Sequence, residues 1–274
     1  MNTVITHFYN EEYILPWWIN HHKKLFDYGI MINHGSTDRS IEICKQMCPH
    51  NWKIVDTCIS EFRTEYIDHE VKFYENTVEG SKMVLTMTEF LMTPMSLDDL
   101  NARMKQHDTN YMKTIGVCMV DSFPHEIPTY SQSLISQKHY GMITGYIDPL
   151  NYNEPDSYKT MYGRFYHNDR YGKYAPGRHW LVGKEENQRG DEGYKAEDVF
   201  VLKYKYSPWN AATIKRIMQF SSKITMWDLE RGLCTPHMLV EDEHNSMYNF
   251  LNRTAYDLRN DPAFLNAFNY CMGS

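Results

Sequence analysis

The sequence predicts an α/β fold in which a mixed, mainly parallel sheet is flanked by helices, as in Rossmann-like nucleotide-binding domains. Three observations predict it. Apolar runs suited to buried strands alternate with helical patterns over residues 3–56. A polar segment follows each of the first two predicted strands. No repeat, low-complexity segment or flexible linker divides the 274 residues, so we expect one domain.

The amino-terminal segment has a β-α-β-α-β rhythm. We expect strands at residues 3–9, 30–32 and 52–56, with one helix that ends at Gly29 and a second that begins at Ser40. Successive strands joined by helices imply parallel strands with right-handed crossovers. The segment His21-His22-Lys23-Lys24 would then lie on the solvated face of the first helix.

The rest of the chain continues the alternation but contains one irregular region. Strands are predicted at 82–87, 115–120 and 199–206, and helices at 66–81, 96–108 and 210–222. Residues 122–195 are rich in Tyr, Gly, Pro, Asn and Asp and are only weakly periodic. We therefore expect a loop-rich region there, built over the carboxyl edge of the sheet.

The composition narrows the possible partners and the compartment. The formal net charge is −7 and no Lys/Arg cluster occurs, so we expect no nucleic-acid partner. None of the six cysteines belongs to a C-x-x-C pair, which favours free thiols in a reducing compartment. We find no signal-peptide pattern and no run of about 20 apolar residues, and we expect a soluble, cytoplasmic protein without a transmembrane segment.

Three polar segments are predicted to meet at the carboxyl ends of the strands, where open α/β sheets bind ligands. They are Thr6 to Glu11, Asn33 to Asp38, and Thr86 to Glu89. A uracil ring needs an aromatic or aliphatic face and polar atoms at its edge. A ribose needs carboxylate or amide acceptors. The candidate donor-binding residues are Thr6, Phe8 and Tyr9 for the base and Glu11, Asn33 and Asp38 for the ribose.

These segments carry a resemblance to a known family. Residues 6–18 (THFYNEEYILPWW), 29–40 (GIMINHGSTDRS) and 86–91 (TMTEFL) are similar to the opening motifs of family 2-like inverting glycosyltransferases with the GT-A fold. Their pattern is roughly N-E-x-x-x-L-x-x-W, then D-x-G-S-T-D, then D-x-D-E-F. Residues 204–237 resemble the closing segment of the same group. Together the matches touch about half of the chain and are weakest across 122–195.

The resemblance implies a function and a division of the domain. Residues 1–120 would form the nucleotide-sugar half and residues 121–274 the acceptor half of one GT-A domain. The donor would be a UDP-sugar, such as UDP-xylose or a UDP-hexose, and the acceptor a hydroxyl of a glycan or glycoprotein. Such transferases also occur in large DNA viruses, a source that a compact chain would fit.

The metal motif departs from the family pattern, because Thr86 and Thr88 replace both aspartates of D-x-D. In the family that motif holds Mn²⁺ or Mg²⁺ against the diphosphate, whose departure the metal assists. Glu89 is the remaining carboxylate and His237 can complete the ligands, so the resemblance implies a divalent metal there. Thr88 stays a donor-binding candidate. The alternatives are a helix-starting acid for Glu89 and a surface histidine for His237.

Without a metal, basic side chains have to neutralise the diphosphate. The candidates are Arg63, Lys203 and Arg216, and Arg63 is also counted among the donor-binding residues. An inverting transfer additionally needs one general base for the acceptor hydroxyl. Asp121, at the end of a predicted buried strand, is the first choice, and Asp148 and Asp198 are rivals. The alternative for Asp121 is an Asp that ends a strand and binds turn amides.

Two other functions compete with sugar transfer. A nucleotidyltransferase on a related fold would need a Gly- and Lys/Arg-rich triphosphate loop after the first strand, but Asn10-Glu11-Glu12 is acidic. A non-catalytic sugar-nucleotide or glycan-binding protein that has lost D-x-D would explain Thr86 and Thr88. Turnover of a sugar-nucleotide donor separates this last alternative from an enzyme.

Overall fold

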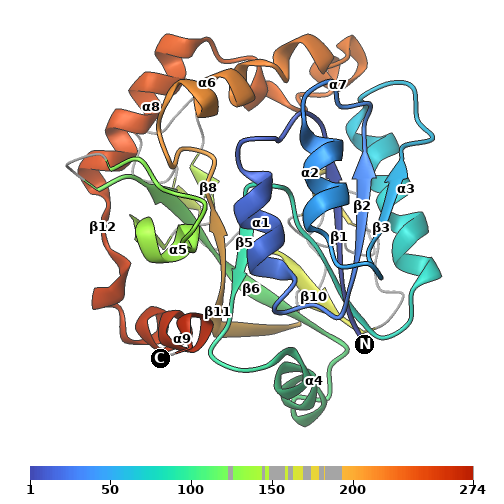
Figure 1. Ribbon diagram of the computed structural model, residues 1–274, viewed down its shortest axis with the longest axis vertical. Coiled ribbons are helices and arrows are strands. Elements are labelled where there is room, and N and C mark those ends of the chain that lie inside the picture. Colours follow the sequence, from blue (N-terminus) through green and yellow to red (C-terminus); the bar gives the residue numbers. More distant parts are fainter. Residues whose placement is uncertain are drawn as a thin grey trace.

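The computed structural model of the chain describes residues 1–122, 126–143, 146–147, 158–159, 163–168, 174–178, 182 and 193–273. In these residues one ten-stranded sheet forms the centre of the molecule, with helices on both faces (Figure 1). Its strands are β1 (Asn2–Phe8), β2 (Tyr28–Asn33), β3 (Lys53–Asp56), β4 (Ser81–Val84), β5 (Glu89–Met92), β6 (Tyr111–Val120), β7 (Tyr140–Met142), β10 (Phe165–His167), β11 (Tyr194–Lys203) and β12 (Tyr256–Asp257). The strands β8 (Tyr146–Ile147) and β9 (Tyr158–Lys159) form a separate antiparallel pair.

The sheet is mostly parallel, as the sequence predicts. Its order is β12-β7-β6-β10-β4-β1-β2-β3, and β11 lies beside β6 and β5. The pairs β1–β2, β2–β3, β1–β4 and β6–β11 are parallel. The strands β5, β7 and β10 run against their neighbours. The carboxyl ends of β1, β4 and β11 therefore reach the same edge as the amino ends of β5 and β10.

The helices cover the two faces and both ends of the sheet. They are α1 (Leu15–His22), α2 (Ser40–Met47), α3 (Thr64–Thr77), α4 (Leu97–Gln106), α5 (Leu134–Gln137), α6 (Ala211–Met218), α7 (Met226–Glu230), α8 (Glu241–Thr254) and α9 (Pro262–Met272), with short 3₁₀ turns at Ser221–Lys223, Thr235–His237 and Leu258–Asn260. In Figure 1, α6 and α7 lie beyond the end to which β2 points, and α4 lies at the opposite end.

Alternation along β1 sorts its side chains between two cores. Val4 and Phe8 belong to the large core that also contains α1, whereas Ile5 packs with Val71 of α3. Successive residues of a strand point to opposite faces, so one strand supplies both cores. This arrangement places α1 and α3 on opposite faces of the sheet.

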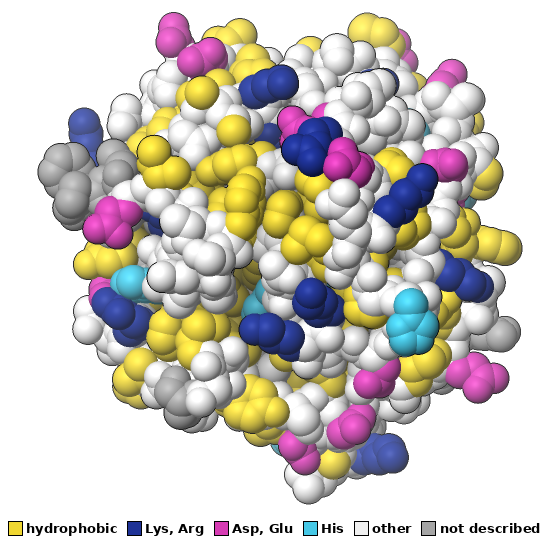
Figure 2. Space-filling model, viewed as in Figure 1, with side chains coloured by type: hydrophobic (Ala, Val, Ile, Leu, Met, Phe, Trp, Pro, Cys, Tyr) yellow, Lys and Arg dark blue, Asp and Glu magenta, His cyan; other side chains and the backbone are white. Residues whose placement is uncertain are grey.

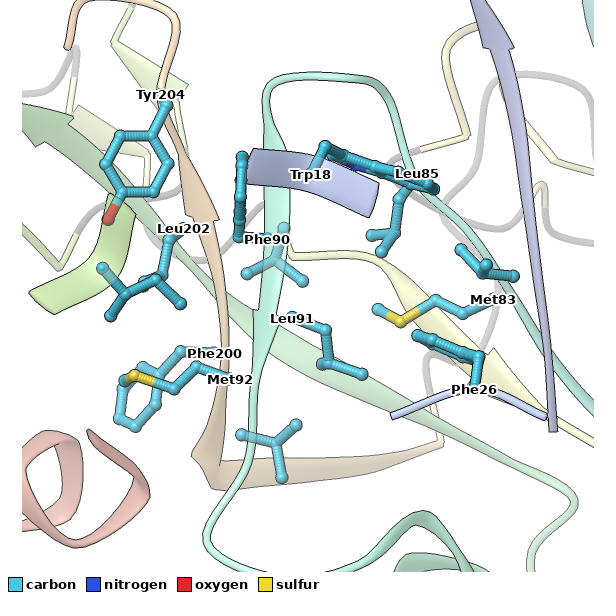
Figure 3. Packing of buried hydrophobic residues seen from close by; sticks show 14 of the residues in the cluster. Trp18, Phe26, Met83, Leu85, Phe90, Leu91, Met92, Phe200, Leu202 and Tyr204 are labelled. Atoms are coloured by element: carbon cyan, nitrogen blue, oxygen red, sulfur yellow. The ribbon is translucent and has the colours of Figure 1, made fainter. Parts of the chain in front are cut away.

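The large core joins β5 and β11 to α1 (Figure 3). Phe90 of β5 and Tyr204, which follows β11, pack edge to face with ring centroids 5.0 Å apart. Trp18 of α1 is fully buried, and its indole Nε1 donates to the carbonyl oxygens of Thr86 (3.1 Å) and Glu89 (3.0 Å). The helix therefore holds in place the segment that the sequence singles out as the metal motif.

The expectation that the first helix ends at Gly29 is wrong. The helix ends at His22, and Gly29 belongs to β2. A Cβ at Gly29 would lie 2.3 Å from the ring of Trp52, so this glycine permits close packing inside the sheet and does not end a helix.

His22 is a core residue and not part of a solvated face. Its Nδ1 lies 2.9 Å from the Trp18 carbonyl oxygen, and its Nε2 accepts from the Leu91 amide at 3.3 Å. These partners define a neutral imidazole that donates through Nδ1. Burial lowers the pKa of His22 well below its ordinary value, because charge is costly in an apolar core.

Other segment predictions need smaller corrections. Helix α3 ends at Thr77, four residues before the predicted end, and β4 covers only the first part of the predicted strand at 82–87. Glu89 begins β5, so it neither starts a helix nor lies at the carboxyl end of a strand. The six cysteines are free, in agreement with the sequence analysis.

On the face seen in Figure 2, basic and acidic side chains are interspersed among hydrophobic ones. In the described part of the chain, no helix has both the length and the apolar character needed to cross a membrane.

We expect Trp18→Phe to lower the free energy of unfolding by about 1–3 kcal/mol, because it removes the indole donor from the buried Glu89 carbonyl oxygen and from that of Thr86. Urea unfolding followed by circular dichroism measures the change. Phe73→Leu is the matched control, since Phe73 is 62% exposed, and a surface change of this kind stays within about 0.5 kcal/mol. Equal stability of Trp18→Phe and the parent protein would contradict the role given to the indole.

Candidate active site

A cavity of about 400 Å³ opens at the edge of the sheet where β1, β4 and β11 end and β5 and β10 begin. The carboxyl edge of parallel strands is where α/β proteins place their ligands. The cavity is lined by His7, Phe8, Tyr9, Glu11, Phe62, Thr64, Ile67, Asp68, Val71, Val84, Leu85, Thr86, Met87, Thr88, Glu89, Arg164, Gly177, Arg178, Lys203, Lys205, Arg216, Ile217, Phe220, Cys234 and His237.

Part of the cavity lining is apolar and aromatic. Ile67 and Val71 of α3 face it together with Phe62 and Phe220, whose ring centroids lie 5.8 Å apart. Phe62 also packs edge to face against His34, with centroids 5.0 Å apart. Flat aromatic faces bordered by aliphatic side chains are suited to a planar base.

The cavity lining also contains many charged side chains. Its basic side chains are Arg164, Arg178, Lys203, Lys205 and Arg216, and its carboxylates are Glu11, Asp68 and Glu89. The lining thus holds two more basic side chains than carboxylates. Such an excess of positive charge in a concave, partly desolvated site attracts anionic ligands.

Burial lowers the pKa values of two lysines in the cavity. It lowers the pKa of Lys203 to about 8, although Glu89 acts in the opposite direction. It also lowers the pKa of Lys205 to about 8, and the neighbouring Arg216 adds to this effect. Both ammonium groups are charged at neutral pH and lose their protons as the pH rises through about 8.

Glu89 and Arg164 form a buried ion pair. Arg164 Nε donates to both carboxylate oxygens of Glu89, at 2.8 and 3.0 Å, and the Thr86 amide donates to Oε2 at 2.9 Å. Burial alone raises the pKa of Glu89, but Arg164 and Lys203 lower it below its ordinary value. The pair joins the start of β5 to the residue that precedes β10.

The side chains near Glu89 do not fit a divalent metal as they stand. Both Glu89 oxygens already accept hydrogen bonds, and a guanidinium occupies the side from which a cation would approach. His237 is buried among cations, so burial, Lys205 and Arg216 lower its pKa to about 3. In the described residues, no group of three His, Cys, Asp or Glu side chains can hold a metal ion. The metal therefore stays a prediction from the resemblance.

Glu11 faces the cavity as a buried carboxylate. Its Oε2 lies 3.7 Å from Arg216 Nη1 and has no hydrogen-bond partner among the described residues. Burial raises the pKa of Glu11 to about 7, with Asp38 adding to the rise and Arg216 opposing it. Arg216 Nε is likewise buried and without a hydrogen-bond partner in the described part of the chain. Two unsatisfied polar atoms at one place indicate a polar ligand.

The structure brings part of the predicted donor and metal site to the cavity. The residues that line it are Phe8, Tyr9, Glu11, Thr88, Glu89 and His237. The remaining predictions, Thr6, Asn33, Asp38 and Arg63, are not part of its lining.

Asn33 and Asp38 hold two loops together instead of facing the cavity. Asp38 accepts from the backbone amides of Glu12 (3.0 Å) and Ser40 (2.9 Å). Asn33 Nδ2 donates to Asp56 at 2.7 Å, and its Oδ1 accepts from the Ser36 amide. Their short polar side chains satisfy turn amides, as such residues often do.

Thr6 and Arg63 are also placed elsewhere. Thr6 is fully buried within β1. The Arg63 guanidinium lies over the rings of Tyr66 (4.3 Å) and Trp227 (4.0 Å) and donates to the Tyr66 hydroxyl. Stacking between two aromatic rings is a common use of arginine at a surface.

The structure does not bring the predicted bases Asp121 and Asp198 to the cavity. Asp121 accepts from Ser207 Oγ (2.7 Å) and the Trp209 amide (2.6 Å), and lies 3.2 Å from Lys138 Nζ. Asp121 therefore binds the turn that follows β11, which agrees with the alternative interpretation of a strand-ending Asp that binds turn amides. Asp198 pairs with Arg103 at 2.6 Å, on the α4 side of the sheet. Asp148 lies outside the described residues.

Sequence reasoning missed four acidic or basic residues of the cavity, Asp68, Arg164, Arg178 and Lys205, as well as aromatic ones such as Phe62 and Phe220. Arg164 and Arg178 belong to the irregular region, where no periodicity indicates which side chains return to the sheet. Lys205 follows β11 in a turn, so strand periodicity does not indicate its place either.

Comparisons with known proteins give likeness of fold only. No protein-family model matches the sequence, and none of the curated proteins matches it. Glucosyl-3-phosphoglycerate synthase from Mycobacterium tuberculosis, in a structure described with Mn²⁺, UDP-glucose and phosphoglyceric acid, is 15% identical at a TM-score of 0.32, and the match covers 42% of this chain and 44% of that one.

Two other solved structures are similar over part of the chain. A putative nucleotide-diphospho-sugar transferase from Desulfovibrio desulfuricans is 8% identical at a TM-score of 0.28, covering 43% of this chain and 58% of that one. A UDP-glucose pyrophosphorylase bound to UDP-glucose is 9% identical at a TM-score of 0.33, covering 61% and 75%. Because all three likenesses are slight, the function proposed below rests on this chain's own residues.

We expect Glu89→Gln to lower the free energy of unfolding by about 3–5 kcal/mol, because it leaves the buried Arg164 without its counter-charge. Chemical denaturation at pH 7 measures the loss. In the parent protein the contribution of the pair is present above the ordinary pKa of a glutamate. It is lost as the pH falls through the lowered pKa of Glu89.

The matched control is Glu42→Gln, which breaks an exposed pair with Arg39 at 2.9 Å and should leave the stability nearly unchanged. The double variant Glu89→Gln/Arg164→Met should recover part of the loss, because no unpaired charge remains buried. Equal losses for the Glu89 and Glu42 variants would contradict a buried pair.

Proposed function

We propose that the chain binds a nucleoside-diphosphate sugar in the 400 Å³ cavity and transfers the sugar to a hydroxyl group. One observation carries the proposal. At the carboxyl edge of a mostly parallel sheet, one cavity is lined by aromatic and apolar side chains and by two more basic side chains than carboxylates. The first suits a base, the second suits a diphosphate, and a site of this kind is where α/β proteins bind nucleotides.

The cations supply what sugar transfer requires most. When the glycosidic bond to the donor breaks, the diphosphate leaves with additional negative charge. Positive groups fixed in a desolvated site stabilise that charge more strongly than water does. Lys203, Lys205 and Arg216 are fixed in this way by the strand end and by α6.

Glu11 is the cavity carboxylate best suited to accept the acceptor's proton. Its Oε2 has no hydrogen-bond partner in the described structure, and burial raises its pKa to about 7. A general base works best when its pKa lies near the pH of the reaction. Asp68 is the rival carboxylate, but one of its oxygens already accepts from the Gly177 amide at 3.1 Å. This role for Glu11 replaces the ribose contact expected from the sequence.

The finer features of the function come from the resemblance. It supports UDP as the nucleotide, inversion at the anomeric carbon, and a glycan or glycoprotein as the acceptor. The aromatic part of the cavity lining, with Phe62 and Phe220, is compatible with uracil and does not select it over other bases.

A non-catalytic sugar-nucleotide-binding protein is the second candidate. Neither Asp121 nor Asp198, two of the three carboxylates expected to act as base, lies at the cavity, and both have other partners. A binding protein would retain affinity for the donor and would not release UDP from it.

Ligand-induced stabilisation tests the binding step. We expect UDP and a UDP-sugar at about 100 times the dissociation constant to raise the melting temperature by roughly 5 °C, since a ligand of the native state adds about 2.7 kcal/mol under these conditions. Differential scanning fluorimetry with UDP, ADP, GDP and uridine measures the shift and its base preference. No shift with any nucleoside diphosphate would refute the proposed ligand.

Turnover tests the chemical step. We expect kcat/KM for UDP release in the presence of a glycan acceptor to rise with pH through about 7, as Glu11 ionises, and to fall above about 8, as Lys203 and Lys205 lose their protons. Glu11→Gln should remove the rising limb and lower kcat by about 10²–10⁴-fold. Chromatographic quantification of UDP follows the reaction.

Glu65→Gln is the control for this experiment, because Glu65 is an exposed carboxylate on α3 and is not part of the cavity. Binding of UDP without release of UDP from any tested donor would favour the non-catalytic candidate. An unchanged pH profile in Glu11→Gln would remove Glu11 from the role of base.

A further inference from the structure

A second feature of the cavity concerns how it balances the charge of a phosphate-containing ligand. Lys203, Lys205 and Arg216, called here the cationic cluster, converge on it from the end of β11 and from α6. Lys203 ends β11 and Lys205 lies in the turn that follows it, and both side chains line the cavity. Arg216 Nη2 donates to the Lys205 carbonyl oxygen at 3.1 Å, which fixes the helix against the strand end.

The described residues balance the charge of Lys205 and Arg216 only in part. Glu11 is the carboxylate nearest to Arg216, at 3.7 Å, and its raised pKa leaves it partly protonated at neutral pH. The charged neighbour of Lys205 is Arg216, a second cation, and its ammonium lies 5.2 Å from the centre of the Tyr206 ring. Like charges held together away from water are costly unless a ligand supplies the opposite charge.

The side chains around the cationic cluster are unfavourable for binding a divalent cation. The Glu89 carboxylate is saturated by Arg164 and the Thr86 amide. His237, the second expected ligand, has Lys205, His244 and Arg216 as its charged neighbours. Coulomb repulsion between a divalent ion and several fixed cations is strong in a partly desolvated cavity. The chain thus has positive side chains where the resembling family has a metal.

We propose that the cationic cluster takes the place of the divalent metal, so that Lys203, Lys205 and Arg216 bind the phosphoryl groups of the ligand without Mn²⁺ or Mg²⁺. The inference rests on the proposed function, because it assigns the diphosphate of the donor to this end of the cavity.

The charge balance of the transfer is complete without a metal. The bond between the anomeric carbon and the phosphate oxygen breaks, and its electron pair stays on the diphosphate. The acceptor oxygen forms the new bond to that carbon and gives its proton to the base. The cationic cluster offsets the negative charge gained by the diphosphate.

Calorimetric titration of UDP, UDP-glucose and inorganic pyrophosphate, each with EDTA and with Mn²⁺, tests the proposal. We expect dissociation constants in EDTA within about threefold of those in Mn²⁺. Lys205→Met should weaken binding of UDP and pyrophosphate by about tenfold or more, as expected for loss of a charged hydrogen bond. Lys205→Arg keeps the charge and should retain most of the affinity.

Lys215→Met is the matched control, because Lys215 precedes Arg216 on α6 but is exposed and is not part of the cavity lining. It removes one positive charge from the same helix and should leave binding unchanged. Circular dichroism of each variant verifies that it is folded, and the Lys205→Arg result distinguishes loss of charge from loss of structure.

The outcomes separate this inference from the proposed function. Binding of UDP only in Mn²⁺ overturns the inference and leaves the proposed function intact. Binding of pyrophosphate in EDTA that depends on Lys205, without binding of any nucleotide, supports the anion site and overturns the proposed function. Equal weakening by the Lys205 and Lys215 variants overturns the inference, because it would reflect net charge and not the cluster. Absence of binding by all three ligands overturns both.

Discussion

The Glu89–Arg164 ion pair is the constraint on which the rest of the cavity depends. It joins the start of β5 to the residue before β10, two segments that are 75 residues apart in sequence. It also influences the charges that the cavity presents, because the Glu89 carboxylate accepts hydrogen bonds from Arg164 and also acts on the pKa of Lys203. The Trp18 indole holds the backbone of the same segment through two carbonyl oxygens. Arg164 thus fixes the side chain of Glu89, and Trp18 fixes the backbone of the same segment.

The elements that the sequence predicted best are those with strong local signals. The rhythm over residues 3–56 led to β1, β2 and β3; the apolar runs of β1 and β2 are buried, whereas β3 at the sheet edge is partly exposed. Helix α4 was equally clear, with Ser96 as a cap that accepts from the Asp99 amide. Gly29 misled because a glycine that ends a helix and a glycine that admits a tryptophan ring look identical in sequence.

The site was less predictable, because its charges pair across long separations. Glu11 and Glu89 lie in recognisable motifs, yet their partners Arg216 and Arg164 lie 205 and 75 residues further along the chain. Asp121 met every local criterion for a base, but tertiary contacts with Ser207 and Trp209 decide its role. A motif identifies which residues are polar at a strand end and cannot state which of them are already satisfied.

The loops at the first two strand ends bind each other before any ligand arrives. The Asn10 side chain accepts from the amides of Thr37 (2.7 Å) and Asp38 (3.3 Å), and the Asn10 amide donates to Ser36 at 3.0 Å. Asn10 itself has a left-handed backbone with φ of 50°, a conformation that asparagine tolerates better than most residues. The rim beside Glu11 is therefore preorganised, and the entropy of ordering it is lost during folding and not during association with a ligand.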